Sequence, residues 1–258
     1  MLPVALTIAG SDPSGGAGIQ ADLKTFHQFG VYGEAVITLA TVQNTQRVSR
    51  VEVLPPDLVA EQIEAVISDI RPQAAKTGAL GSADVIDAVA RLAAEFEFPL
   101  IVDPVLISKH GARLLSSDGE RALKNLLRHA ALVTPNIPEA EALTGLGIQS
   151  EEDMIAAATR LLEFGCRAAL VKGGHRESGD AADVLVTRSS VQRFSRPRLQ
   201  TRNTHGTGCT FSAAITACLA KGFDLAAAVD RAKRYIQAAI ESAVPLGSGI
   251  GPLNHFAS

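Results

Sequence analysis

Short apolar runs alternate with amphipathic segments along the first two thirds of the chain. The apolar runs have the length of buried strands, and in the segments between them apolar residues recur every three to four positions. The runs predicted to be strands are residues 4–10, 34–41, 74–78, 99–105, 131–136 and 168–174. The segments predicted to be helices are residues 18–30, 55–70, 82–96, 119–129 and 151–164. This alternation predicts a three-layer α/β/α fold with a mainly parallel central sheet.

The last third of the chain has a different pattern. Residues 183–194 alternate between apolar and polar positions, as a β-hairpin does, and helices are expected to begin at Thr210 and Leu225. Ser82 is the expected N-cap of its helix. Since no linker, repeat or low-complexity tract interrupts the pattern, we expect residues 1–258 to form a single domain.

Composition and charge narrow the range of functions. A hydrophobic fraction of 47% in 258 residues can build a sizeable core. The net charge of −3 gives no electrostatic reason to expect nucleic acid or an anionic membrane as a partner. One basic cluster, residues 193–202, is either a solvated face or a contact for an anionic phosphate ligand.

The N-terminal segment and the cysteines bear on the compartment. The opening residues lack a charged n-region and a long apolar run, so we expect neither a signal peptide nor a membrane span. Cys166, Cys209 and Cys218 have no metal-ligand spacing and cannot all pair, so thiols in a reducing cytoplasm are expected.

Four of the predicted strands end in polar or glycine residues. In open α/β sheets, ligands bind beyond the carboxyl ends of the strands, and parallel strands bring those ends to one edge. The four ends are residues 10–12, 103–104, 134–136 and 172–174. The loop that carries Cys209 can join them, and together they predict a ligand site.

The glycine-rich stretch "AGSDPSGGAGIQA" does not fit a P-loop. Gly10 and Gly15 have the required spacing, but Gly16 and Ala17 stand where lysine and serine or threonine must bind phosphate and magnesium.

The same stretch matches a dinucleotide fingerprint through Gly16, Gly18 and Ala21. The following strand, however, ends near Gln43 and Asn44 instead of an acidic residue for the ribose. We therefore interpret this stretch as a tight turn between a strand and a helix, whose backbone can approach a small ligand closely.

The loop "NTHGTGCTFSAAI" places a thiol where a loop becomes a helix. Cys209 could be a nucleophile served by His205 and Asn203, a proton acceptor, one wall of an anion site, or buried filler. Successive backbone N–H groups before a helix suit an anion. Together with Asp103 and Glu139 as possible magnesium ligands and Lys172 as a phosphate partner, this loop favours phosphoryl transfer.

These residues carry a resemblance to a known family. Eight segments, in order, are similar to the hydroxymethylpyrimidine and phosphomethylpyrimidine kinases of thiamine biosynthesis, which belong to the ribokinase-like superfamily. They are "TIAGSDPSGGAGIQADLKTF", "VQNT", "KTGAL", "VDPV", "VTPNIPEAEALTG", "VKGGH", "NTHGTGCTFSAAI" and "GPLNHF". The resemblance covers essentially the whole chain, and the first segment and the cysteine loop are its most specific parts.

The resemblance implies a reaction and a set of site residues. It implies ATP and Mg²⁺ as cofactors, a small pyrimidine as substrate and a homodimer as the assembly. The implied pyrimidine-binding residues are Gly10, Ala17, Asp22, Val42, Gln43, Leu80 and Val105. Asn136, Lys172 and Thr207 would bind the nucleotide, and Asp103 and Glu139 would lie at the metal. The backbone of Gly206, Thr207, Gly208 and Cys209 would form the anion hole.

Cys209 resembles the family's catalytic residue. Sugar kinases of the superfamily carry an aspartate general base at this position, and the pyrimidine kinases carry cysteine. We therefore expect the Cys209 thiol to act as the base, eased toward thiolate by the helix end.

Other functions remain open at this stage. One is a pyridoxal kinase of the same superfamily; others are a ligand-binding protein on the same fold and a thiol-nucleophile transferase. Residues 106–115 resemble the family's flexible loop over the site, and His110 within them is given no role.

Overall fold

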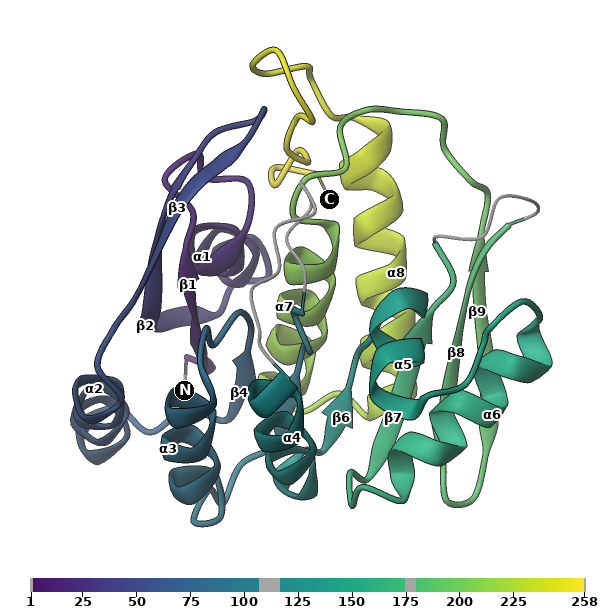
Figure 1. Ribbon diagram of the computed structural model, residues 1–258. Coiled ribbons are helices and arrows are strands. Elements are labelled where there is room, and N and C mark those ends of the chain that lie inside the picture. Colours follow the sequence, from purple (N-terminus) through teal and green to yellow (C-terminus); the bar gives the residue numbers. More distant parts are fainter. Residues whose placement is uncertain (1, 107–116, 175–179, 258) are drawn as a thin grey trace.

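The computed structural model describes residues 2–106, 117–174 and 180–257, which build a nine-stranded sheet with helices on both faces (Figure 1). The strand order is β3-β2-β1-β4-β5-β6-β7-β8-β9. The strands are β1 (Val4–Ser11), β2 (Tyr32–Gln43), β3 (Val48–Val53), β4 (Ala74–Thr77), β5 (Leu100–Val102), β6 (Leu132–Val133), β7 (Ala168–Lys172), β8 (Ala181–Thr187) and β9 (Val191–Arg196). The helices are α1 (Gly18–Gln28), α2 (Pro56–Asp69), α3 (Ala83–Ala93), α4 (Ser117–Leu126), η1 (Leu127–His129), α5 (Ile137–Thr144), α6 (Glu151–Leu162), α7 (Thr207–Ala220) and α8 (Leu225–Glu241).

The pairing of the strands follows from the length of their connections. The six central strands β2, β1, β4, β5, β6 and β7 pair in parallel. The chain passes through at least one helix between each of these six strands and the next of the six, which gives it the length that a parallel connection needs. At the two edges, β3 pairs antiparallel with β2, and β8 and β9 continue antiparallel from β7. The predicted three-layer α/β/α fold with a mainly parallel sheet is confirmed.

The two faces of the sheet bury different helices. Leu6 and Ile8 of β1 pack into one core with α2, α3, α4, α5 and α6, while the intervening Ala5 packs against α1 and α7 on the other face. Farther along the sheet, Ile101 of β5 and Leu170 of β7 pack against α7 and α8. Because successive side chains of a strand point to opposite faces, strands covered on both sides read as unbroken apolar runs.

Three elements differ from the sequence prediction. β3 was not predicted; its exposed edge position leaves only a weak apolar pattern in Val48–Val53. The short helix α5 (Ile137–Thr144) follows β6 directly and was missed as a separate element. Helix α7 begins at Thr207 instead of Thr210, so part of the predicted anion loop forms its first turn.

Other local predictions are confirmed. Ser82 caps α3 by accepting a hydrogen bond from the backbone N–H of Val85. The hairpin of β8 and β9 is present, and the three cysteines are thiols. No helix among the described residues has both the length and the apolar character needed to span a bilayer. The loop predicted at residues 106–115 lies, after Leu106, outside the described residues.

Candidate active site

The carboxyl ends of β5, β6 and β7 meet around the carboxylate of Asp103. Its Oδ1 lies 3.1 Å from Lys172 Nζ and accepts a hydrogen bond from Thr134 Oγ1 at 3.3 Å. Its Oδ2 accepts a hydrogen bond from Ser212 Oγ of α7 at 3.2 Å. Asp103 is buried, so these partners replace the water that a carboxylate would otherwise require. The predicted convergence of these strand ends with the cysteine loop is confirmed.

Lys172 carries a positive charge into this edge of the sheet. Burial alone would lower its pKa, but the carboxylates of Asp103 and Glu139 outweigh this effect and hold the pKa above its ordinary value. Its ammonium group is therefore charged, and the side chain is only 12% exposed. A charged donor of this kind suits the oxygens of a phosphate, whereas it has no lone pair with which to accept a proton.

Asn136 and Glu139 form a capping box at the start of α5. The Asn136 side chain accepts from the backbone N–H of Glu139 at 2.9 Å, and Glu139 Oε2 accepts from the backbone N–H of Asn136 at 2.8 Å. The N-x-x-E spacing thus has a local structural role, because two backbone N–H groups of the helix start are satisfied reciprocally. One carboxylate oxygen of Glu139, Oε2, is therefore occupied by the hydrogen bond from the Asn136 N–H.

Burial disfavours the ionised form of Glu139. Burial raises the pKa of Glu139 to about 7, and the neighbouring Asp103 adds to this while Lys172 opposes it. The folded state therefore binds this proton more tightly than the unfolded chain does. The stabilisation is complete below the ordinary value of 4.5 and is lost as pH rises toward 7.

Glu139→Gln should keep the capping box, because a glutamine side chain can accept the same hydrogen bond. We expect this variant to lose less stability than the wild type between pH 4.5 and pH 7, since it has no carboxyl to ionise. Its turnover should fall strongly if the charge serves the nucleotide phosphates. Thermal denaturation across this pH range and steady-state rates measure both effects.

Asn136→Ala is the matched comparison for this variant, because it removes the N-cap and should cost about 0.5–2 kcal/mol of stability. A Glu139→Gln protein as destabilised as Asn136→Ala would show that Glu139 is only structural.

The start of α7 is built for close backbone contact. Gly206 has a φ of 80°, and a Cβ there would lie 1.8 Å from the carbonyl oxygen of Gly16, so another residue cannot be accommodated. A Cβ on Gly208 would lie 3.4 Å from Lys172 Nζ, which places the first turn of α7 over the lysine. The N–H groups of Thr207, Gly208 and Cys209 belong to this first turn and have the positive end of the helix dipole behind them.

Cys209 is half-buried in that turn, and its environment does not favour the thiolate. Burial raises its pKa to about 11; Lys76 lowers it, and the carboxylates of Asp22 and Asp103 raise it further. The expectation that the helix end eases this thiol toward thiolate is therefore wrong, because the pKa of Cys209 lies above its ordinary value. Desolvation and two nearby carboxylates both disfavour the charged form of this thiol.

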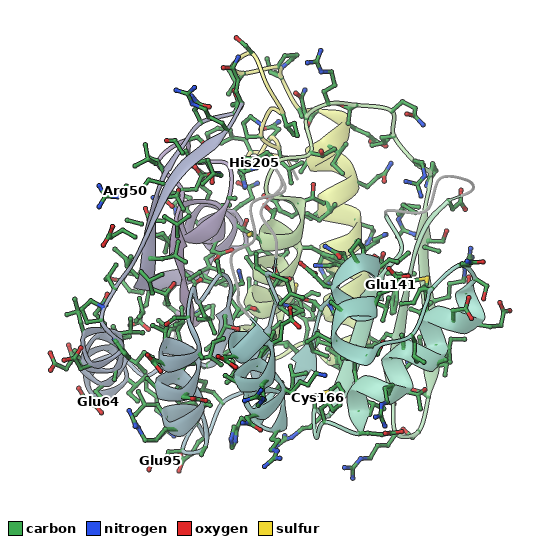
Figure 2. All side chains as sticks on the ribbon, viewed as in Figure 1. Arg50, Glu64, Glu95, Glu141, Cys166 and His205 are labelled. Carbon is green, nitrogen blue, oxygen red and sulfur yellow. The ribbon has the colours of Figure 1, made fainter. Side chains whose placement is uncertain are left out.

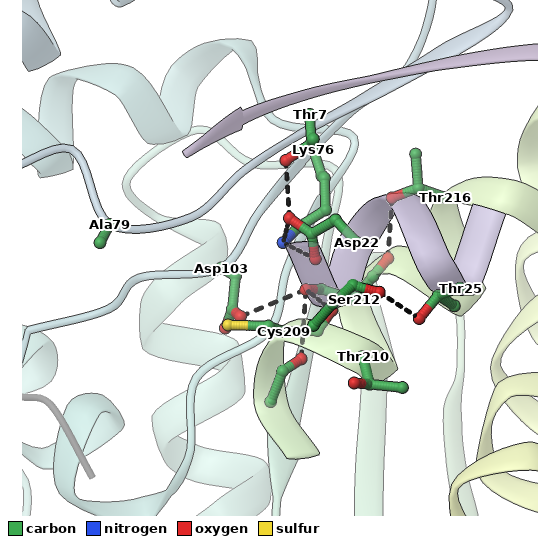
Figure 3. A network of polar contacts seen from close by, with 12 residues as sticks. Thr7, Asp22, Thr25, Lys76, Ala79, Asp103, Cys209, Thr210, Ser212 and Thr216 are labelled. Carbon is green, nitrogen blue, oxygen red and sulfur yellow. Dashed lines mark hydrogen bonds and ion pairs between the residues drawn. The ribbon is translucent and has the colours of Figure 1, made fainter. Parts of the chain in front are cut away.

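A buried ion pair lies near Cys209 (Figure 3). Lys76 Nζ of β4 lies 2.9 and 2.8 Å from the two carboxylate oxygens of Asp22, and Thr7 Oγ1 donates to Asp22 at 2.6 Å. Both charged side chains are completely buried. Burial lowers the pKa of Lys76, but the Asp22 carboxylate more than offsets this and the net shift is upward.

The structure does not place Asp22 where a ligand could touch it. It was predicted to bind the pyrimidine, yet its exposed fraction is 0% and all its described side-chain hydrogen bonds are to Lys76 and Thr7. Asp22 forms part of the buried polar layer next to Cys209 instead, and this corrects the sequence prediction of a direct contact.

The glycine-rich turn after β1 is organised by Asp12. Its Oδ1 accepts from the backbone N–H and the hydroxyl of Ser14 at 2.8 and 2.7 Å. Its Oδ2 accepts from the N–H groups of Gly16 and Ala17 at 3.2 and 2.9 Å. A Cβ on Gly10 would meet the Leu39 side chain at 2.5 Å, so a larger residue near the end of β1 would have to displace Leu39.

The remaining predicted pyrimidine contacts lie on two sides of this turn. Gln43 is at the end of β2 and its Nε2 lies 3.1 Å from His205 Nε2, while the neighbouring Val42 is exposed. Leu80 and Val105 line a small cavity beside Asp103. A larger cavity of about 600 Å³ lies between residues 200–203 and 245–249 and is lined by none of the predicted site residues.

Two groups of the site were missed by the sequence analysis: Lys76 was predicted only as part of a strand and Ser212 only as part of a helix. Asp12 was predicted as one of the polar strand ends of the site, but its partner His205 was not. Their partners are distant in the chain, so nothing in local spacing could have assigned them. His205 was considered only as a base for a nucleophilic thiol, whereas it lies against Asp12 and Gln43 at the end of the sheet far from Cys166 (Figure 2).

The basic cluster at residues 193–202 behaves largely as a solvated face. Arg193 pairs with Glu151 at 2.8 Å and Arg196 with Asp230 at 3.1 Å, in both cases with substantial exposure.

Asp103 and Glu139 fit a magnesium ion that also takes ligands from water and from substrate phosphates. Among the described residues, no three His, Cys, Asp or Glu side chains are grouped so that they could hold a metal by themselves. Asp103 is close enough to Glu139 to raise its pKa, and the raised pKa of Glu139 marks a charge that lacks full compensation. Magnesium commonly uses one or two carboxylates together with waters and substrate phosphates, and the pair fits that mode.

Comparison with known proteins gives a consistent family match. The family model described as phosphomethylpyrimidine kinase matches residues 12–254. A hydroxymethylpyrimidine/phosphomethylpyrimidine kinase of Bacillus subtilis is 47% identical over 256 residues, which cover 98% of this chain and 94% of that protein. A thiamine biosynthesis bifunctional protein of Geobacter sulfurreducens is 52% identical over 97% of this chain, which spans only 52% of that longer protein.

Solved structures agree with this match. A phosphomethylpyrimidine kinase from Clostridium difficile is 43% identical, with a TM-score of 0.82 over 92% of this chain and 99% of that one. The ADP complex of a Bacillus subtilis pyridoxal kinase is 36% identical, with a TM-score of 0.92 over 100% of this chain and 98% of that one.

Proposed function

This chain belongs to the phosphomethylpyrimidine kinase family, and from that membership we propose its reaction. The enzyme transfers the terminal phosphoryl group of ATP to the hydroxymethyl oxygen of 4-amino-5-hydroxymethyl-2-methylpyrimidine. It then transfers a second phosphoryl group to the resulting monophosphate, which yields the diphosphate used in thiamine biosynthesis. The observation that carries the proposal is the meeting of Lys172, Asp103 and the first turn of α7 at one edge of the sheet.

Each part of the site has a role in this transfer. The N–H groups of Gly206, Thr207, Gly208 and Cys209 bind the charge that develops on the transferring phosphoryl group. Lys172 binds the nucleotide phosphates, held in place by Asp103, and Asn136 orders the adjacent backbone. Cys209 accepts the hydroxyl proton in the first transfer. Because burial raises the pKa of Cys209 to about 11, the thiol must first release its own proton to solvent, and the resulting thiolate takes the hydroxyl proton as the oxygen attacks.

Asp103 and Glu139 are the residues that would hold a magnesium ion, Glu139 through the oxygen that the capping box leaves available. When bound, the ion would neutralise phosphate charge and so favour the approach of the nucleophile. Nucleotide affinity with and without divalent ions, in the wild type and in Glu139→Gln, tests this assignment.

The pyrimidine is placed against the turn of Gly10 and Ala17, with Val42, Leu80 and Val105 as apolar walls. Gln43 recognises the aminopyrimidine edge, because a side-chain amide offers both a donor and an acceptor. Gln43→Leu should weaken pyrimidine binding by about 1–3 kcal/mol, since a buried polar partner is left unpaired. Calorimetry with the pyrimidine measures this, and equal affinity in the variant would remove Gln43 from the pocket.

Pyridoxal phosphorylation is the second candidate activity, favoured by the likeness to the Bacillus subtilis pyridoxal kinase. Side-by-side rates with the pyrimidine and with pyridoxal separate the two. A kcat/KM that is higher for pyridoxal would reverse the assignment.

The setting of the enzyme is part of the same proposal. We place it in the cytoplasm, where its thiols stay reduced, as a homodimer of single kinase domains spanning residues 1–258. Sedimentation at several concentrations tests the dimer.

A further inference from the structure

A single imidazole nitrogen lies between two elements of the site. His205 Nε2 is 2.8 Å from Asp12 Oδ2 in the glycine-rich turn and 3.1 Å from Gln43 Nε2 at the end of β2. His205 itself comes from the loop directly before α7 and is 3% exposed. The residue therefore joins the turn that receives the pyrimidine, the proposed recognition amide and the anion loop.

The imidazole is held firmly in this position. A Cβ on Gly16 would lie 2.4 Å from His205 Cδ2, so the ring packs directly on the backbone of the turn. The backbone N–H of His205 donates to the carbonyl of Gly251 at 3.0 Å. Gly206, the next residue, contacts the carbonyl oxygen of Gly16 with no room for a side chain. The ring cannot move without displacing the turn or the start of α7.

Asp12 decides which ring nitrogen carries the proton. Burial raises the pKa of Asp12, but hydrogen bonds from His205 and Ser14 outweigh it and the net pKa is lowered, so this group is a carboxylate. An ionised carboxylate only accepts hydrogen bonds. The ring nitrogen at 2.8 Å from Oδ2 must therefore bear a hydrogen, which is the Nε2–H tautomer.

That tautomer determines how the Gln43 amide is oriented. A ring nitrogen that carries a hydrogen has no lone pair for a second donor, so an N–H of Gln43 facing it would be unsatisfied. A 180° rotation of the amide exchanges its oxygen and nitrogen at nearly the same positions. With Oε1 toward the imidazole, the Nε2–H of His205 is shared between Asp12 and Gln43.

We propose that His205, held by Asp12, is a specificity-determining positioning residue that fixes Gln43 with Oε1 toward the imidazole and its NH₂ group free for the substrate. This inference rests on the proposed function, because it assigns Gln43 to the pyrimidine. An amide fixed in this way favours a heterocycle that presents a ring-nitrogen acceptor and disfavours one that presents a ring N–H donor. His205 acts through Gln43 and does not touch the reacting atoms.

The first test is a comparison of two substitutions. His205→Leu should raise KM for the pyrimidine about 10–100-fold while KM for ATP and kcat at saturating pyrimidine change little. It should also lower the ratio of kcat/KM for the pyrimidine to that for pyridoxal. His205→Gln keeps an N–H donor at similar reach and should recover most of both losses. Equal losses in the two variants, or a fall in kcat with an unchanged pyrimidine KM, would overturn the proposal.

The matched controls are His129→Leu and His129→Gln, since His129 is exposed on η1. They should leave every kinetic constant unchanged.

The second test needs no activity. Two-dimensional ¹H–¹⁵N spectra of the histidine side chains, assigned by the loss of a signal in His205→Gln, report which ring nitrogen is protonated. A protonated Nε2 in His205 is expected, and an unprotonated Nε2 overturns the proposal. A wild-type enzyme that fails to phosphorylate the pyrimidine would refute the proposed function instead, whatever the tautomer.

Discussion

Cys209→Ala should lower kcat for the first phosphorylation about 10²–10⁴-fold, the usual contribution of a positioned general base. Affinity for the nucleotide should change little, because the anion-hole donors are backbone N–H groups that the substitution keeps. The second phosphorylation should suffer far less. Its nucleophile is a phosphate oxygen that is already ionised near neutral pH, so no hydroxyl proton has to be removed.

The pH profile gives an independent reading of the same role. Because burial raises the pKa of Cys209 to about 11, the wild-type rate of the first step should rise with pH above neutrality, and the second step should lack this rise. Cys209→Asp should restore part of the first step, as a carboxylate performs it in sugar kinases. It should not improve the second step, because the carboxylate charge repels the phosphate monoester.

Cys218→Ala is the matched control, since this buried thiol lies in the same helix and packs in the core. It should cost stability without affecting the ratio of the two steps. A fully active Cys209→Ala enzyme would remove the thiol from the mechanism. A phosphorylated or substrate-bearing Cys209 trapped during turnover would establish a covalent nucleophile instead.

Lys76→Met should destabilise the protein by about 3–5 kcal/mol, because it leaves the Asp22 carboxylate buried without its partner. Chemical denaturation at neutral pH measures this loss. The double variant Lys76→Met with Asp22→Asn removes both charges and should recover much of the stability. If the double variant is no more stable than the single one, the loss comes from packing and not from the unpaired charge.

The Lys76→Met variant should also affect the proposed general base, Cys209. The charge of Lys76 lowers the Cys209 pKa, so its loss should move the pH profile of the first step further upward. A surface ion pair offers the contrast: Arg50→Met breaks the exposed pair with Glu52 and should cost less than about 1 kcal/mol.

Much of the fold was accessible from the pattern of apolar positions. The six parallel strands were predicted because each reads as an apolar run next to amphipathic helices, and all but β2 are buried along most of their length. β3 was not, because an exposed edge strand buries too little to leave that signal. α5 was missed because its helix starts directly after β6, with only the Asn136 capping box as a marker.

The sequence by itself determined which strand ends carry polar groups and which loop could bind an anion, because turn residues and glycines act locally. It could not determine the electrostatic environment that sets the pKa values of these groups. Cys209 was expected to have a lowered pKa from its helix position, but burial and the carboxylates of Asp22 and Asp103 raise it. The pairing of Lys76 with Asp22, and of His205 with Asp12 and Gln43, joins residues between 54 and 193 positions apart. Such contacts are decided by how the sheet and helices pack, since pair energies depend on distance and burial and not on separation along the chain.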